Sequence, residues 1–310
     1  MATNFRHSAE NIRREVELIL DRVGILCRVF ARGKENSSLK KKFDREPGKY
    51  SRDGKMVQDA IGVRVVLYFA EDVEIVSRLL EREFVIDKES STIDLPKTDQ
   101  FAVTRHNLIF KIPDQHSDDV KRCIGTAPID NTFEVQLRSI LSEGWHEVEH
   151  DLRYKSKKNW ETQEDLGRAL NGIIATIETA EWSMRKIFDD LAYRNYKCRK
   201  WPEMLHNRIR MRAEPVLSEE ICAVFNEDNE IAKKIFRIDR KKVIFLFNSV
   251  RPTLPINLDN IVYIWNYLGP MEEKITAITP SFVLETLLSS NGQILTGVVT
   301  EEDEEEVSLG

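Results

Sequence analysis

Apolar residues recur at helical spacing near the start of the chain and at strand spacing further on. Between residues 9 and 30 they fall on one face of a helix, which predicts an amphipathic helix over this range. Residues 61–69 are instead β-branched and almost continuously apolar, as expected of a central buried strand. The amphipathic pattern of residues 71–84 predicts a helix, so these two segments form a βα unit.

The middle of the chain continues this alternation. Residues 84–95, 105–112 and 132–139 are predicted strands, and residues 117–123 form a short helical turn. The segment after the last strand, up to residue 155, has the spacing of a helix with an apolar back and a front rich in titratable groups. Alternating strands and helices predict an α/β fold, in which helices flank a sheet.

The remainder of the chain has only helical patterns. Residues 165–196 form one long predicted helix, and five shorter apolar segments follow between residues 218 and 288. We therefore expect a first domain over residues 1–200, a small helical module over residues 201–295 and a tail over residues 296–310. The tail contains the run TEEDEEE, whose charge predicts disorder.

Charge and cysteine usage narrow the class of protein. The net charge of the 310 residues is −6, yet residues 34–55 are basic, which indicates binding of phosphates. No apolar run is long enough to span a membrane, and the N-terminus is too polar for a signal peptide, so we expect a cytoplasmic protein. The cysteines lie far apart without a C-x-x-C motif, which favours reduced thiols over a zinc knuckle: Cys27, Cys123, Cys198 and Cys222.

The helix before residue 155 allows two incompatible chemistries. His146-Glu147-Val148-Glu149-His150 is a complete H-E-x-x-H, the zinc-binding pattern of metalloproteases. However, the two positions between Glu147 and His150 are usually uncharged in that class, and one of them here is Glu149. No residue is marked as a third ligand, so we expect no zinc.

The alternative rests on several motifs in fixed order. Arg32-Gly33-Lys34 with Ser38 and Lys42 matches R-x-K-x-x-x-S-x-x-x-K, and residues 59–65 match D-x-x-x-x-R-V at the head of a strand. Residues 134–155 add E-x-Q-x-R on a strand and then Trp145, Glu149-His150 and Tyr154-Lys155. In this order the motifs closely resemble the signature of the RelA/SpoT nucleotide pyrophosphokinases.

The resemblance implies a fold and a set of roles. The fold is a nucleotidyltransferase-like mixed β-sheet flanked by helices, here followed by the C-terminal helical module. Asp59 and Glu134 are the expected catalytic residues; both would hold Mg²⁺, for which Mn²⁺ is a substitute, and Glu134 would activate the attacking hydroxyl. ATP is the expected donor, and its phosphates would contact Arg32, Lys34, Ser38, Lys42 and Arg64. The residues expected to bind the acceptor or line the site are Phe101, Arg105, His106, Gln136, Arg138, His150, Tyr154 and Lys155.

Each of these residues also has an ordinary structural explanation. Asp59 alone is a typical turn residue, an isolated strand Glu such as Glu134 usually faces water, and His106 alone is a strand histidine bonded to a carbonyl. Their joint order and spacing favour the active-site interpretation.

The chain departs from the family at a position that contacts the acceptor nucleotide. Synthetases of the alarmone (p)ppGpp, which act in the stringent response, usually have a tyrosine four residues before the strand histidine, and here that position is Ala102. Phe101 stands one residue away and would replace the ring only if the loop shifts. Transfer to a guanosine nucleotide is the first expectation, and transfer to a tRNA 3′ end by a growth-arresting or phage-defence toxin is the second. A nucleotide-binding regulator without turnover is the third.

Two further expectations concern domains and partners. The segment before Arg32 is a single predicted helix, so the hydrolase half of the long family members is expected to be missing. The C-terminal helical module is a candidate surface for a regulatory partner or for assembly into a homo-oligomer.

Overall fold

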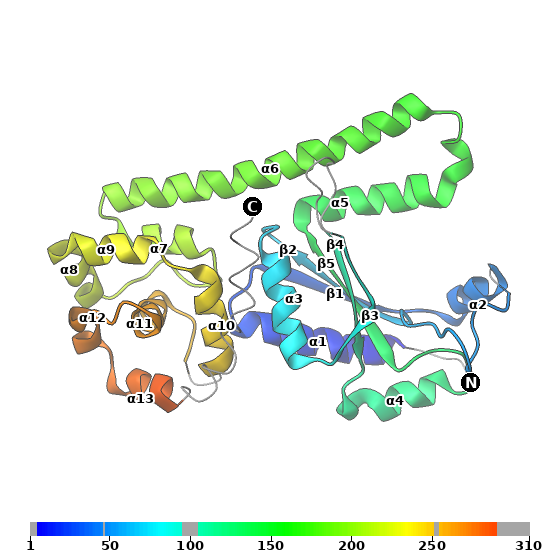
Figure 1. The fold of residues 1–310 in the computed structure, drawn as a ribbon, viewed down its shortest axis with the longest axis horizontal. Coiled ribbons are helices and arrows are strands. Elements are labelled where there is room, and N and C mark those ends of the chain that lie inside the picture. The colour runs from blue at the N-terminus through cyan, green and yellow to red at the C-terminus, as the bar shows by residue number, and fades with distance from the viewer. Residues whose placement is uncertain (1–4, 46, 95–104, 251–253, 290–310) are drawn as a thin grey trace. The chain divides into compact units, whose positions relative to one another are not determined.

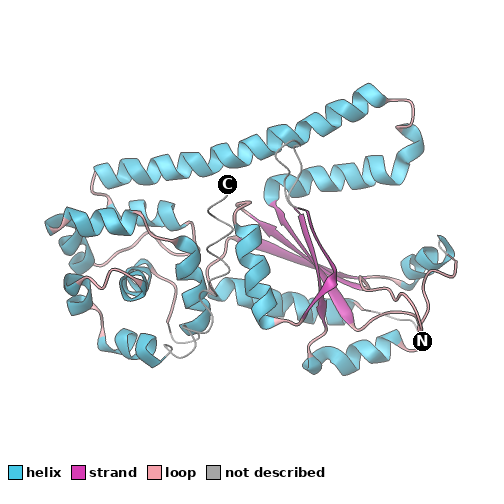
Figure 2. Cartoon of the chain, in the orientation of Figure 1, coloured by secondary structure: helices cyan, strands magenta, loops and turns pink. Residues whose placement is uncertain are grey.

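The computed structural model describes residues 5–45, 47–94, 105–250 and 254–289. Its five-stranded sheet has the order β1-β2-β5-β4-β3 (Figures 1 and 2). β2 and β5 run parallel, and the other neighbouring strands are antiparallel. The strands are β1 (Cys27–Gly33), β2 (Ile61–Leu67), β3 (Ile86–Asp94), β4 (Arg105–Lys111) and β5 (Thr132–Ser139). The predicted mixed α/β sheet with flanking helices and a helical C-terminal region is confirmed.

The two faces of the sheet differ in chemistry. Val63 pairs with Val135 and Val65 with Leu137, and all four side chains are buried. Helices α1 (Arg6–Arg22) and α3 (Asp72–Glu83) supply a covering layer, since both bury apolar side chains and α3 contacts β4 and β5. Side chains alternate along a strand, so the other face presents polar groups of the same two strands. The sheet therefore offers one polar face for chemistry.

The first predicted helix is wrong beyond Arg22. Gly24 has a φ of +69°, a left-handed conformation that glycine adopts without strain and that ends the helix. Cys27–Gly33 then forms the edge strand β1, whose side chains alternate between buried and exposed. Arg32 is thus carried by a strand and pairs with Gly62 of β2. The helix α2 (Asn36–Arg45) follows.

The helical segment after β5 is divided into three parts. Ser139 caps α5 (Ile140–Val148) by accepting a hydrogen bond from the backbone N–H of Ser142 at 3.0 Å. A π-helical turn (Glu149–Arg153) and a 3₁₀ turn (Tyr154–Asn159) continue the chain. On the predicted apolar back of this helix, Leu141 and Trp145 are half-buried, whereas Leu152 is 63% exposed and Val148 48% exposed. The titratable front therefore makes the contacts with the sheet.

Two compact units divide the chain: Met1–Leu20 with Cys27–Ser183, and Asp21–Leu26 with Met184–Gly310. The predicted boundary at residue 200 stays a prediction. Among the described helices, none combines the length and apolar composition needed to cross a membrane. The remaining helices are α4 (Asp114–Ile124), α6 (Glu164–Lys197), α7 (Trp201–Ile209), α8 (Glu219–Glu227), α9 (Asn229–Phe236), α10 (Arg240–Val250), α11 (Leu258–Leu268), α12 (Glu273–Ile278) and α13 (Ser281–Ser289).

Candidate active site

Two carboxylates occupy the polar face where β2 begins. Asp59 precedes β2, and Glu134 lies on β5 opposite Gly62. Asp59 forms ion pairs with two lysines: its Oδ2 lies 2.5 Å from Nζ of Lys34, and its Oδ1 lies 2.9 Å from Nζ of Lys42. The structure thus joins the strand end, the β1–α2 connection and α2 around one carboxylate.

The two carboxylates differ in protonation chemistry. Burial opposes ionisation of Asp59, but the hydrogen bonds and charges of Lys34 and Lys42 outweigh it and hold its pKa below the ordinary value. Burial raises the pKa of Glu134, and the negative charge of Asp59 raises it further against the hydrogen bond from Gln136. Asp59 is therefore ionised more readily than an ordinary aspartate, and Glu134 takes up a proton more readily than an ordinary glutamate.

This pair fits a divalent cation on its own electrostatics. The repulsion between Asp59 and Glu134 that raises the pKa of Glu134 would be relieved by a cation between them. Among the described residues, no group of three or more His, Cys, Asp and Glu side chains could hold a metal ion. Nucleotide phosphates and water would have to complete the coordination shell, as is usual for Mg²⁺.

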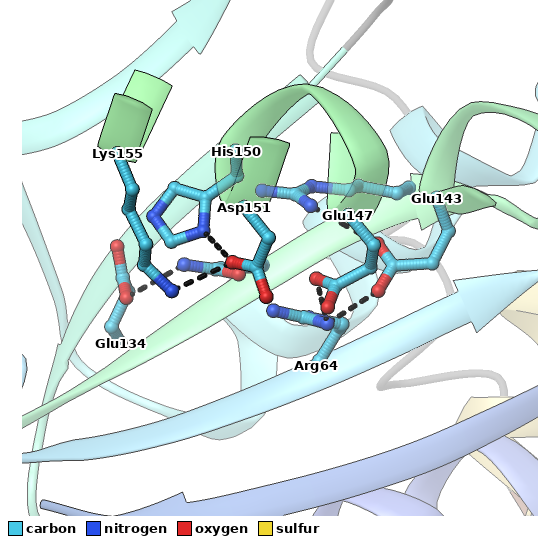
Figure 3. A network of polar contacts seen from close by, with 9 residues as sticks. Arg64, Glu134, Glu143, Glu147, His150, Asp151 and Lys155 are labelled. Carbon is cyan, nitrogen blue, oxygen red and sulfur yellow. Dashed lines mark hydrogen bonds and ion pairs between the residues drawn. The ribbon is translucent and has the colours of Figure 1, made fainter. Parts of the chain in front are cut away.

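A second cluster connects the sheet to α5. Nη1 of Arg64 lies 2.5 Å from Oε1 of Glu143 and 2.6 Å from Oε1 of Glu147 (Figure 3). Glu143 also accepts a hydrogen bond from Nη1 of Arg138 at 3.0 Å. Burial lowers the pKa of Arg138, and the charge of Glu143 opposes that shift. Glu143 is thus shared by two arginines from neighbouring strands.

The π-helical turn adds a third cluster. Oδ1 of Asp151 lies 2.9 Å from Nδ1 of His150 and 2.6 Å from Nζ of Lys155 (Figure 3). The rings of His150 and Tyr154 stack with centroids 5.7 Å apart. These four side chains are all at least half exposed to solvent. They can reorient toward a ligand with little loss of burial.

Two cavities lie on the polar face and share four residues. The first has a volume of about 170 Å³, opens to solvent and has Phe30, Glu134 and the shared residues in its lining. The second has a volume of about 230 Å³, also opens to solvent and extends to Arg138, His150 and Lys155. The shared residues are Arg32, Arg64, Gln136 and Glu147. Because the two open cavities share these residues, they are parts of one polar site.

Most of the sequence-predicted site residues meet here, with exceptions. The prediction that His106 lines this face must be corrected. His106 pairs with buried Leu137, whereas Gln136 pairs with the next residue, Asn107, so His106 lies on the opposite face from Gln136. Ser38 is exposed on α2, one turn before Lys42. Arg105 begins β4, whereas Phe101 and Ala102 lie outside the described residues.

Three polar side chains and one ring were missing from the predicted site. Glu143, Glu147 and Asp151 are spaced four residues apart and each contacts a cation of the site. That spacing on the polar front of a helix was the available signal. Phe30, which is 56% exposed, was missed because its strand was predicted as a helix.

The H-E-x-x-H pattern is not carried by one regular α-helix. α5 ends at Val148, and His150 belongs to the π-helical turn. His146 is buried beside the ring of Trp145, whereas His150 is half exposed and bonded to Asp151. The two histidines therefore lie in different surroundings.

Comparison with known proteins identifies the domain that carries this site. Residues 31–159 match the model of the region found in RelA/SpoT proteins. This range contains every predicted site residue, from Arg32 to Lys155. No curated protein sequence matches the chain.

Several solved structures are similar. Small alarmone synthetase 1 from Bacillus subtilis has 19% sequence identity and a TM-score of 0.43, over 59% of this chain and 91% of that one. The protein smu.1046c from Streptococcus mutans UA159 has 22% identity and a TM-score of 0.43, over 59% and 92%. A GTP pyrophosphokinase family protein from Streptococcus pneumoniae has 19% identity and a TM-score of 0.41, over 59% and 89%. On the strength of the matched region and its motifs, residues 31–159 are a domain of the RelA/SpoT family of nucleotide pyrophosphokinases.

Proposed function

We propose that this chain transfers pyrophosphate from ATP to the 3′-hydroxyl of a guanosine nucleotide, forming a (p)ppGpp-type alarmone. The observation that carries the proposal is the pair Asp59 and Glu134 on one polar face, surrounded by lysines and arginines. Phosphoryl transfer requires neutralised phosphate charge, a held metal ion and an oriented hydroxyl. The face offers residues for each requirement.

In the proposed reaction the acceptor 3′-oxygen attacks the β-phosphorus of ATP. The bond from that phosphorus to the oxygen bridging the α- and β-phosphates breaks, and AMP leaves with the bonding electrons. The hydroxyl proton passes to Glu134, which releases it to water. Burial raises the pKa of Glu134, and this supports the role because a stronger base accepts the proton more readily.

Charged residues around the pair would bind the substrates. Asp59 and Glu134 would hold Mg²⁺, or Mn²⁺ in its place, and the bound ion would neutralise charge on the phosphates. Lys34 and Lys42 would exchange part of their contact with Asp59 for phosphate oxygens. Arg32 and Arg64 line the first cavity beside Glu134 and suit bidentate phosphate contacts.

Transfer to a tRNA 3′ end, as a growth-arresting or phage-defence toxin, is the second candidate. Ala102 favours it, because this position has no ring to stack on a free guanine base. Loss of turnover is the third candidate, and the presence of both Asp59 and Glu134 argues against it.

Incubation with γ-labelled ATP and Mg²⁺ tests the proposal. Separate reactions contain GTP, GDP, ATP or tRNA, and omission of the metal is the control. Label in a guanosine product with release of AMP would support the first candidate, and label in tRNA the second. Nucleotide binding without label transfer to any acceptor would favour the regulator.

A further inference from the structure

The long helix α6 carries an apolar stripe that the described residues of its own chain cover only in part. With 34 residues the helix is about 51 Å long, yet Ala192 is its one buried residue in this fully described element. Ile187 is 64% exposed, Leu166 53% and Ile173 47%. Helices in proteins owe most of their stability to packing of an apolar face. Within the described residues, α6 buries little of its apolar face for a helix of this length.

The stripe has the spacing of a coiled-coil seam. Apolar residues follow one another at alternating steps of four and three residues, which keeps them on one side of a helix that pairs with another. We define the α6 seam as Leu166, Leu170, Ile173, Ile177, Ala180, Met184, Ile187 and Leu191. The repeat is sustained over more than three heptads, the length at which this pattern favours a coiled coil.

Among the described residues, the hydrogen bonds made by side chains of α6 to the rest of the chain use residues outside the seam, and Trp145 reaches the backbone carbonyl of the seam residue Leu170 at 3.3 Å. Nη1 of Arg153 lies 2.7 Å from Oδ1 of Asn171, and Ser139 donates a hydrogen bond to Glu181. Asp189 accepts hydrogen bonds from Arg208 and Arg210. Within the seam, Leu166, Ile173, Ala180, Ile187 and Leu191 are exposed, and Leu170, Ile177 and Met184 are half-buried. The exposed side of the seam is therefore available to a further helix.

The ends of the helix indicate which partner fits. The first turn carries Glu164 and Asp165, and the last turn carries Arg194 and Lys197. In an antiparallel pair of two such helices, the acidic end of each lies beside the basic end of the other, whereas a parallel pair brings like charges together. A second copy of α6 is thus complementary in charge when it runs antiparallel.

The seam is also compatible with this arrangement in register. With Leu166 opposite Leu191 of the second copy, Leu170 meets Ile187, Ile173 meets Met184, and Ile177 meets Ala180. Every seam residue then has an apolar partner, and small Ala180 lies near the two-fold axis. Such a self-complementary contact closes into a dimer and cannot extend into a filament.

We propose that the α6 seam is a dimer interface that pairs with the α6 seam of a second copy in antiparallel orientation. This inference is independent of the proposed reaction. The proposed interface lies on α6, the helix that follows the RelA/SpoT domain.

Light scattering during size-exclusion chromatography tests the interface over a range of protein concentrations. The unchanged chain should be a dimer, and Ile173→Asp or Ile187→Asp should yield a monomer with unchanged helical circular dichroism. Trp182→Asp is the matched control, since Trp182 is 61% exposed on α6 but lies outside the seam. A monomeric unchanged chain, or a dimer that survives both seam variants, would overturn the proposal.

Disulfide trapping tests the orientation in a Cys198→Ser background, because Cys198 is exposed just beyond α6. Leu166→Cys and Leu191→Cys are prepared as separate proteins. A covalent dimer that forms only when the two are mixed is the expected result. Efficient cross-linking of either variant with itself would overturn the antiparallel arrangement.

Discussion

Glu134 and Asp59 are neighbouring carboxylates with opposite pKa shifts. Their amide variants are expected to lose transfer activity alike but to differ in stability. Glu134→Gln and Asp59→Asn should each reduce transfer by about two orders of magnitude or more, since each removes a charged oxygen ligand or base. Initial rates with labelled ATP measure this loss. Unimpaired transfer in Glu134→Gln would exclude the proposed base.

Thermal unfolding against pH separates the two roles. The pKa of Glu134 is raised in the fold, so its stabilising contribution is complete below the unfolded pKa and is lost as pH rises through the folded pKa. Glu134→Gln should therefore raise the melting temperature at pH 7 and lose that advantage in acid.

The pKa of Asp59 is lowered, so its stabilising contribution is present above the unfolded pKa and is lost as pH falls through the folded pKa. Asp59→Asn should lower the melting temperature at pH 7.

Ala102, which lies outside the described residues, sets the expectation for the acceptor. Ala102→Tyr should raise kcat/KM for GDP and GTP by about tenfold, because stacking of a base on an aromatic ring contributes about 1–3 kcal/mol. Steady-state rates with both nucleotides measure the gain, and Ala102→Leu controls for added apolar bulk. Rapid use of GDP by the unchanged protein would instead indicate another stacking residue, with Phe101 the first to test.

His146 and His150 are expected to respond differently to substitution. Both histidines line the second cavity, but His150 is half exposed and bonded to Asp151, so His150→Ala should reduce transfer more than His146→Ala does. His146 is buried, and its loss should act mainly on the melting temperature. Metal analysis of the purified protein should find no stoichiometric zinc. Stoichiometric zinc that both variants lose equally would revive the protease interpretation.

At the scale of an element, α5 is held to the sheet by its carboxylates. Glu143 contacts Arg64 and Arg138, and the side chains of Glu143 and Arg138 are only 13% and 11% exposed. Glu143→Gln should lower the free energy of unfolding by about 3 kcal/mol, because it leaves a buried arginine charge uncompensated. Glu147→Gln is the matched variant: Glu147 is 51% exposed, so its loss should cost less than about 1 kcal/mol.

Chemical denaturation with matched m-values measures this difference between the two variants. Equal stability of Glu143→Gln and Glu147→Gln would contradict the anchoring role of Glu143. Since Glu147 contacts Arg64 as well, Glu147→Gln should also lower the KM for ATP by freeing that guanidinium for phosphate.

At the scale of the whole molecule, the segment after α1 belongs to the C-terminal unit. The carbonyl of Gly24 accepts a hydrogen bond from the backbone N–H of Arg212 at 2.8 Å, and Arg212 also pairs with Asp21. A Cβ on Gly24 would lie 3.1 Å from Cδ1 of Ile256. The helical module is therefore joined to residues close to the beginning of the chain.

Gly24→Ala tests this connection. It should lower the free energy of unfolding by more than the roughly 1–2 kcal/mol that a left-handed backbone costs an alanine, because the added methyl group also meets Ile256. Gly48→Ala is the control, since Gly48 also has positive φ but a Cβ there meets no atom within 4 Å. A cost for Gly24→Ala no greater than for Gly48→Ala would contradict close packing at Gly24.

Periodicity in the sequence determined the elements whose local pattern is strong. The strands around residues 61–69 and 132–139 and the helix over 165–196 are present with nearly the predicted bounds. Their residues repeat at the period of one structure, so local preference and burial agree. The order of the motifs also determined the family and most of the residues on the polar face, because those motifs sit on or beside such elements.

Tertiary structure alone decided the remaining features, each of which depends on contacts between distant residues. β1 is a strand because Cys27–Gly33 pairs with β2, although its apolar residues also fit a helix. The face occupied by His106 follows from the β4–β5 register, which a shift of one residue would reverse. The pairing of Arg64 with Glu143 and Glu147 exists only once α5 packs over β2. Sequence periodicity reports which side of an element is apolar, and only the assembled fold determines which element that side meets.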